Sequence, residues 1–67
     1  MEKTKGMVIL GGRKVTIYET DQQCNYTTYQ DVKSIEILTI NNSLFWRLHM
    51  TDKTTATFLM KEWEVAL

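Results

Sequence analysis

Two hairpins that share a strand occupy residues 34–60, and they constrain the fold more than any other feature of this chain. The first hairpin is expected to turn at Asn41 and Asn42, because asparagine tolerates the positive φ that a two-residue turn needs. In the register set by this turn, apolar residues lie opposite apolar residues and an acid lies opposite a base. The pairs are Ile37 with Trp46, Ile35 with Leu48 and Glu36 with Arg47. Such pairs stabilise antiparallel strands by about 0.2 to 1 kcal/mol each, and a one-residue shift would lose all three.

The second hairpin is predicted to turn within residues 51–54. Continuing the same ladder gives a third strand with this register: Trp46 opposite Leu59, Arg47 opposite Phe58 and Phe45 opposite Met60. Three strands of an antiparallel meander follow from these two turns.

Both faces of this meander are rich in apolar side chains. Strict alternation assigns a core to one face: Ile35, Ile37, Leu44, Trp46, Leu48, Met50 and Leu59. The opposite face carries a second apolar set, with Glu36, Arg47 and His49 toward one end: Leu38, Ile40, Phe45, Ala56, Phe58 and Met60. A sheet that is apolar on both sides must be covered on both sides, by its own curling, by a second layer or by another subunit.

The remaining segments predict further strands. Residues 7–18 have the pattern of a hairpin that turns at Gly11 and Gly12, with Val8 opposite Val15. Residues 19–31 are polar and are interpreted as a loop or a twisted edge strand containing residues 26–29. Alternation in residues 61–67 favours a last strand. The predicted fold is all-β, a small antiparallel meander of five to six strands that forms a curled sheet or small barrel.

The length of 67 residues predicts one domain covering residues 1–67. A domain of this size buries only about 60% of the surface of its unfolded chain, so added support is expected. One cysteine cannot form an internal disulfide, and no ligand spacing suggests structural zinc or another cofactor. Self-association is the remaining support, and we expect a homodimer or higher oligomer.

No signal peptide or membrane span is predicted, because the first apolar run covers only residues 7–10. A cytoplasmic location is therefore expected. Short chains of this kind are common in bacteria and their phages.

Charge is distributed unevenly along a chain that is neutral overall. Residues 1–14 contain four basic residues and one acidic residue, a net charge of +3, whereas the remainder carries −3. One interpretation is an anion-binding hairpin, where backbone amides of the glycine turn and basic side chains contact a nucleic-acid backbone or a lipid headgroup: Lys3, Lys5, Arg13 and Lys14. The simpler interpretation, a solvated terminus beside a glycine turn, is favoured because dedicated nucleic-acid binders have a basic domain pI. A third interpretation is head-to-tail self-association, in which the basic segment of one copy binds the acidic part of another.

The aromatic side chains allow two interpretations as well. Those on the predicted strands have the pattern of core or interface packing, although stacking platforms for single-stranded bases would use the same residues: Phe45, Trp46, Phe58 and Trp63. Three tyrosines in more polar surroundings are candidates for partner contact: Tyr18, Tyr26 and Tyr29.

Catalytic groups are few. The only histidine, His49, and the only cysteine, Cys24, fall on different predicted elements, which disfavours a thiol–imidazole pair. Glu62 and Glu64 have a spacing that acid–base catalysis can use, but they are interpreted as a charged strand edge. We expect no catalytic site, no metal site and no enzymatic activity.

One segment resembles a known family. Residues 29–37, followed by a strand carrying Trp46 and another ending in Thr57, Phe58 and Leu59, are similar to the middle of bacterial pleckstrin-homology-like domains. The resemblance covers less than half of the chain, and the closing helix of that family is not predicted here. It implies a half-barrel and a lipid- or protein-binding module.

Two functions are predicted from different classes. The first is a non-enzymatic protein-interaction or oligomerisation module, in which the second apolar face binds a like subunit or a target protein through five residues: Leu38, Ile40, Phe45, Phe58 and Met60. The alternative is a small β-barrel that binds nucleic acid or another anion through the basic amino-terminal segment.

Overall fold

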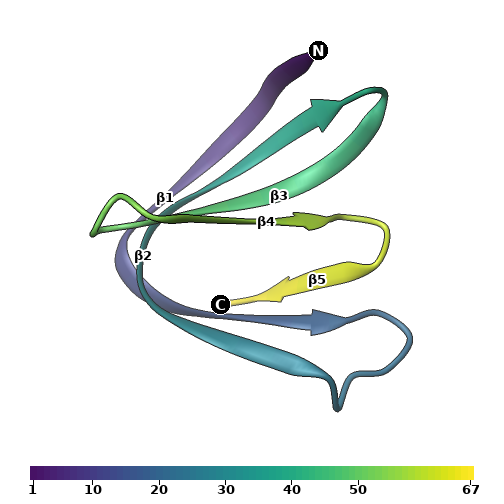
Figure 1. The fold of residues 1–67 in the computed structure, drawn as a ribbon. Helices are drawn as coiled ribbons and strands as arrows, with labels where there is room; N and C mark the ends of the chain where they lie inside the picture. Colours follow the sequence, from purple (N-terminus) through teal and green to yellow (C-terminus); the bar gives the residue numbers. More distant parts are fainter.

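The computed structural model describes all 67 residues and contains five antiparallel strands (Figure 1). These are β1 (Glu2–Glu19), β2 (Tyr26–Ile40), β3 (Ser43–Met50), β4 (Thr55–Leu59) and β5 (Trp63–Ala66). Their order in the sheet is β4-β3-β2-β1-β5, so the chain forms a meander whose last strand returns to pair with the first. The predicted all-β meander is confirmed, as a five-stranded curled half-barrel. The chain forms no helix long and apolar enough to cross a membrane.

The β2–β3 hairpin has the predicted turn and register. Asn41 and Asn42 both have positive φ, 49° and 68°. Glu36 lies opposite Arg47, Ile37 opposite Trp46, and Ile35 opposite Leu48. The two asparagines therefore supply the left-handed backbone that sets this register.

The predicted register between β3 and β4 is wrong by one residue. Trp46 lies opposite Phe58, and Phe45 lies opposite Leu59. The cause is a three-residue loop, closed by a hydrogen bond from the Met50 amide to the Thr54 carbonyl and containing Lys53 at a φ of 74°. A three-residue loop with its last residue left-handed replaces the four-residue turn that we expected. Phe58 therefore shares a face with Trp46, and not with Phe45.

The predicted hairpin at Gly11 and Gly12 is also wrong, because β1 continues through both residues. Their φ angles are 69° and 94°, and residues 10–12 of β1 lie opposite residue 33 alone in β2. Glycine supplies the positive φ of a bulge as readily as that of a turn. The bulge bends the strand, and β1 pairs along its length with β2.

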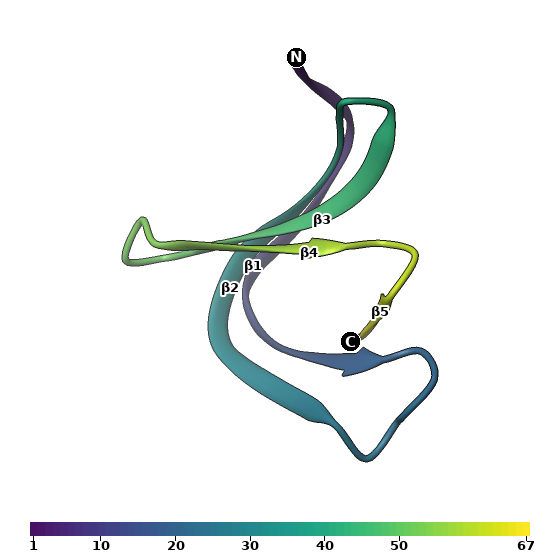
Figure 2. The same ribbon diagram turned by 45° about the vertical axis from the view of Figure 1, so that its right-hand side comes forward.

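The bend divides the sheet into two arms, with β4 and β5 lying between them (Figures 1 and 2). One arm contains β3 and the adjoining halves of β1 and β2; the other contains the remaining halves of β1 and β2. The core lies between the arms and contains five buried apolar residues: Val15, Ile17, Val32, Ile35 and Leu48. We call the side of the sheet that carries Ile35 and Leu48 the core face, and the opposite side the outer face.

Aromatic side chains close the half-barrel between β4 and β5. The ring of Phe58 lies 6.0 Å from that of Tyr29 and 5.5 Å from that of Trp63, measured between centroids. The indole N–H of Trp46 donates a hydrogen bond of 2.9 Å to the Trp63 carbonyl. Three of the four aromatics for which core packing was favoured therefore pack against the core: Trp46, Phe58 and Trp63. Phe45 is half-buried on the outer face instead.

Candidate functional site

The amino-terminal half of β1 is an unpaired sheet edge. Its neighbour β2 lies on one side along most of its length, but β5 pairs on the other side only between Thr16 and Glu19. Residues 2–14 therefore have no strand on their second side. Alternate backbone N–H and C=O groups of an edge strand point outward without partners, and such an edge is a template for another strand.

Three consecutive apolar side chains are exposed on this edge. Met7 is 49% exposed, Val8 45% and Ile9 74%. Val8 lies opposite Ile35 on the core face, whereas Met7 and Ile9 alternate onto the outer face. An incoming strand would therefore find apolar side chains on both faces of the position it would occupy.

Basic side chains flank the apolar stretch on both sides. All four residues of the predicted anion site are exposed, and none forms a salt bridge: Lys3, Lys5, Arg13 and Lys14. The only acidic residue in this segment, Glu2, is already bound by Arg47, at 2.6 Å and 3.2 Å from its two carboxylate oxygens. The positive charge of the edge is therefore uncompensated. Because Gly11 and Gly12 form a bulge, these residues lie along one strand and not around a hairpin tip.

A polar cluster on the outer face fixes this edge to the sheet. Glu36, which is buried, accepts hydrogen bonds from the Thr4 hydroxyl and pairs with His49 Nε2 at 2.9 Å. These hydrogen bonds, from Thr4 first and then from His49, hold the pKa of Glu36 below its ordinary value. Arg47 lowers the pKa of Glu2 in the same way. The predicted grouping of Glu36, Arg47 and His49 is present, and Thr4 and Glu2 extend it onto β1.

The five predicted partner-binding residues do not form one surface. Leu38 is fully buried, and Phe58 lies on the core face between two aromatic rings. Ile40 and Phe45 are half-buried on the outer face, and Met60 is half-buried in the turn after β4. The prediction placed Phe58 and Met60 on the same face as Phe45 because it assumed a four-residue turn between β3 and β4. The three-residue loop shifts the register by one residue, so Phe58 lies on the core face.

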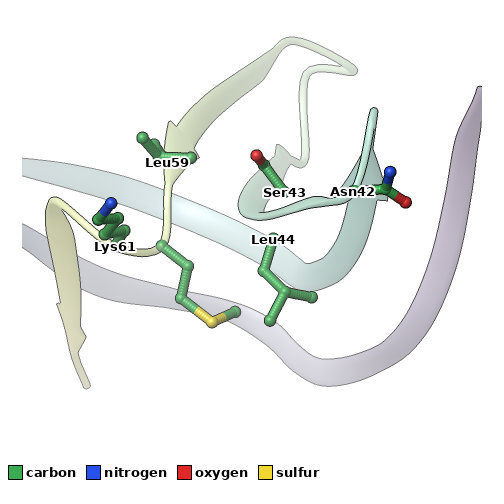
Figure 3. A pocket seen from close by; sticks show the side chains of 6 residues that line it. Asn42, Ser43, Leu44, Leu59 and Lys61 are labelled. Atoms are coloured by element: carbon green, nitrogen blue, oxygen red, sulfur yellow. The ribbon is translucent and has the colours of Figure 1, made fainter.

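Met60 lines a pocket of about 460 Å³ where β3 meets the turn between β4 and β5. Its other lining residues are Asn42, Ser43, Leu44, Leu59 and Lys61. Ser43 and Leu44 face Leu59 and Lys61 across it (Figure 3). The Met60 amide donates a hydrogen bond of 3.0 Å to the carbonyl of Leu44, another lining residue. The ammonium group of Lys61 is the one charged group in this pocket, which otherwise offers packing and hydrogen bonding.

The tyrosines proposed for partner contact separate into two groups. Tyr18 and Tyr26 line a smaller hollow of about 290 Å³ with Thr16 and Gln23. Tyr29 is half-buried and packs its ring against Phe58. Only the first group remains available to a partner.

The groups considered for catalysis lie on separate elements. Cys24 is exposed in the turn between β1 and β2, whereas His49 lies in β3 and pairs with Glu36. Glu62 and Glu64 are exposed at and near β5.

The free edge of β1 is not predicted from the sequence, because the predicted hairpin pairs residues 7–10 with residues 13–18. An exposed apolar run between two basic pairs was the signal that could have indicated it. Comparison with protein-family models, with curated proteins and with solved structures found no match for this chain.

Proposed function

We propose that this chain is a non-enzymatic protein-interaction module that pairs the free edge of β1 with an extended strand of a partner, either a target protein or a like subunit. The observation that carries the proposal is the coincidence of an unpaired edge with three consecutive exposed apolar side chains at Met7, Val8 and Ile9. In strand addition, backbone hydrogen bonds supply affinity and alternate side chains supply specificity.

The rigidity of the edge supports this proposal. Thr4 and Glu2 fasten the start of β1 to Glu36 and Arg47, and Leu10 packs against the core at the end of the apolar stretch. A strand already held in its extended conformation loses less conformational entropy when it binds.

Protection of the edge is incomplete, which also supports the proposal. Soluble proteins prevent edge pairing with short strands, prolines, bulges or charges. This edge has bulges near Lys5 and at residues 10–12, but the regular ladder between them, from Gly6 to Ile9, presents its most apolar part without such a device.

Site-specific photo-crosslinking tests the proposal. A photoreactive phenylalanine analogue placed at Ile9 is expected to form covalent adducts with a protein in cells that produce this chain. The matched control places the analogue at Leu44, which is 43% exposed but belongs to β3. Adducts at position 9 and not at position 44 would support an interaction edge. A folded protein that gives no adduct at position 9, or gives equal adducts at both positions, would contradict it.

A further inference from the structure

We infer that the occupant of the β1 edge is an extended acidic segment of another protein, with an apolar centre and carboxylates toward its ends, and not a second copy of this chain. This inference rests on the proposed function and adds the chemistry of the partner.

Charge complementarity is the first step of the argument. Residues 1–14 carry a net charge of +3, and their single carboxylate, Glu2, is satisfied by Arg47. A strand paired with residues 6–9 would have Lys3 and Lys5 beyond one end, and Arg13 and Lys14 follow the bulge beyond the other end. Opposite charges across adjacent strands stabilise the pair, and like charges opposite one another destabilise it. Carboxylates near both ends of the incoming strand therefore match the edge.

The centre of the incoming strand is defined by the apolar stretch. The regular part of the ladder runs from Gly6 to Ile9, where β1 pairs with residues 34–37 without interruption. Met7 and Ile9 point to one face and Val8 to the other. β-Branched side chains at the centre of the partner would pack against them on both faces.

Self-pairing through this edge is disfavoured by the same charges. Two copies of β1 related by a twofold axis would bring two segments of net charge +3 into one antiparallel ladder. If the axis passes through Val8, the end of each copy that carries Lys3 and Lys5 faces the end of the other copy that carries Arg13 and Lys14, so that like charges approach one another. No free carboxylate of residues 1–14 is available to offset this repulsion, because Glu2 is paired with Arg47.

The test uses a labelled nine-residue peptide with the sequence Glu-Glu-Val-Thr-Val-Thr-Val-Glu-Glu. Fluorescence polarisation compares it with three probes: the same peptide with lysine for every glutamate, the same peptide with proline for both threonines, and a nine-nucleotide polydeoxythymidine. The glutamate peptide is expected to bind at least tenfold more tightly than the lysine peptide in low salt, and the difference should shrink in 500 mM NaCl. The proline peptide should not bind measurably, because proline removes backbone donors and distorts the strand.

Matched charge reversals locate the site. Lys3→Glu with Lys5→Glu should weaken binding of the glutamate peptide by about tenfold, whereas Lys53→Glu with Lys61→Glu should change it by less than about twofold. All four lysines are exposed and outside the salt bridges, so neither double variant should alter the fold. Circular dichroism checks that both variants remain folded.

Each remaining outcome decides against the inference. Equal binding of the two peptides would overturn it, although strand addition itself would survive. Tighter binding of the oligonucleotide than of the glutamate peptide would assign the edge to polyanions. A solution mass of two chains that falls to one in the Ile9→Lys variant would identify a second copy as the occupant, and the proposed function would again survive. Failure of every probe to bind to a monomeric protein would also overturn the inference.

Discussion

Replacing Gly12 with alanine should destabilise the fold through the backbone alone. Gly12 has a φ of 94°, and a Cβ added there would meet only the Thr51 Cγ2 atom, at 4.0 Å. No clash with a neighbour therefore contributes. An L-residue in the left-handed region costs about 1 to 2 kcal/mol. Because alanine also has less entropy to lose on folding, the net loss in the free energy of unfolding should be about 1 kcal/mol.

Gly6 provides the matched control on the same strand. A Cβ at Gly6 has nothing within 4 Å, and its φ lies outside the positive range. Gly6→Ala should therefore raise the free energy of unfolding by about 0.4 to 1 kcal/mol, by reducing the freedom of the unfolded chain. The two variants should differ by roughly 2 kcal/mol, a large fraction of the about 3 to 10 kcal/mol expected for a domain of this size.

Urea denaturation followed by tryptophan fluorescence measures this difference, because Trp46 and Trp63 both pack against the core. Thermal unfolding should show the same order, with midpoints separated by roughly 10 °C. If Gly12→Ala proves as stable as Gly6→Ala, β1 does not bend at a left-handed Gly12, and the description of a continuous bent first strand is wrong.

Three further predictions concern the core, the polar cluster and the closure of the half-barrel. Ile17→Ala should lower the free energy of unfolding by about 2 to 5 kcal/mol because Ile17 is fully buried, whereas Ile9→Ala at the exposed edge should change it by less than about 0.5 kcal/mol. Urea unfolding measures both values, and equal losses would contradict the assigned core. Since the folded pKa of Glu36 lies below its ordinary 4.5, its stabilising contribution is fully present above about pH 4.5 and is lost as the pH falls through the folded value. The urea midpoints at pH 7 and pH 3 should therefore differ less in Glu36→Gln than in the wild type, and an unchanged acid sensitivity would refute the role of this carboxylate. Trp46→Phe should reduce stability by about 0.5 to 1.5 kcal/mol through loss of the hydrogen bond to the Trp63 carbonyl; a variant as stable as the wild type in thermal unfolding would show that this bond does not hold β5 in place.

The sequence predicted the all-β class and the β2–β3 hairpin because local chemistry is unambiguous there. Asn41 and Asn42 favour a two-residue turn, and only one register places the flanking apolar residues together. The turn between β3 and β4 lacks such a signal. Lys53 adopts a positive φ that lysine rarely favours, so the shorter loop was not predictable from residue preference.

The predicted hairpin at Gly11 and Gly12 is wrong because a pair of glycines is compatible with two different structures. Gly11 and Gly12 satisfy both a hairpin turn and a bulge, and the choice depends on long-range pairing with β2. Once β1 is continuous, its apolar residues lie at a sheet edge and not inside a local hairpin. The candidate site therefore follows from tertiary pairing, whereas the basic residues that flank it were identified from the sequence.

Amide hydrogen exchange of the ¹⁵N-labelled protein, alone and with the glutamate-ended peptide, tests most directly whether the β1 edge is an interaction site. In the free protein, alternate amides of residues 2–10 should exchange rapidly, because they point away from β2 without a partner. The peptide should slow the exchange of these same amides and leave those of β4 unchanged. Uniformly slow exchange along β1 in the free protein, or peptide-induced protection confined to other strands, would contradict the assignment of this edge as the binding site.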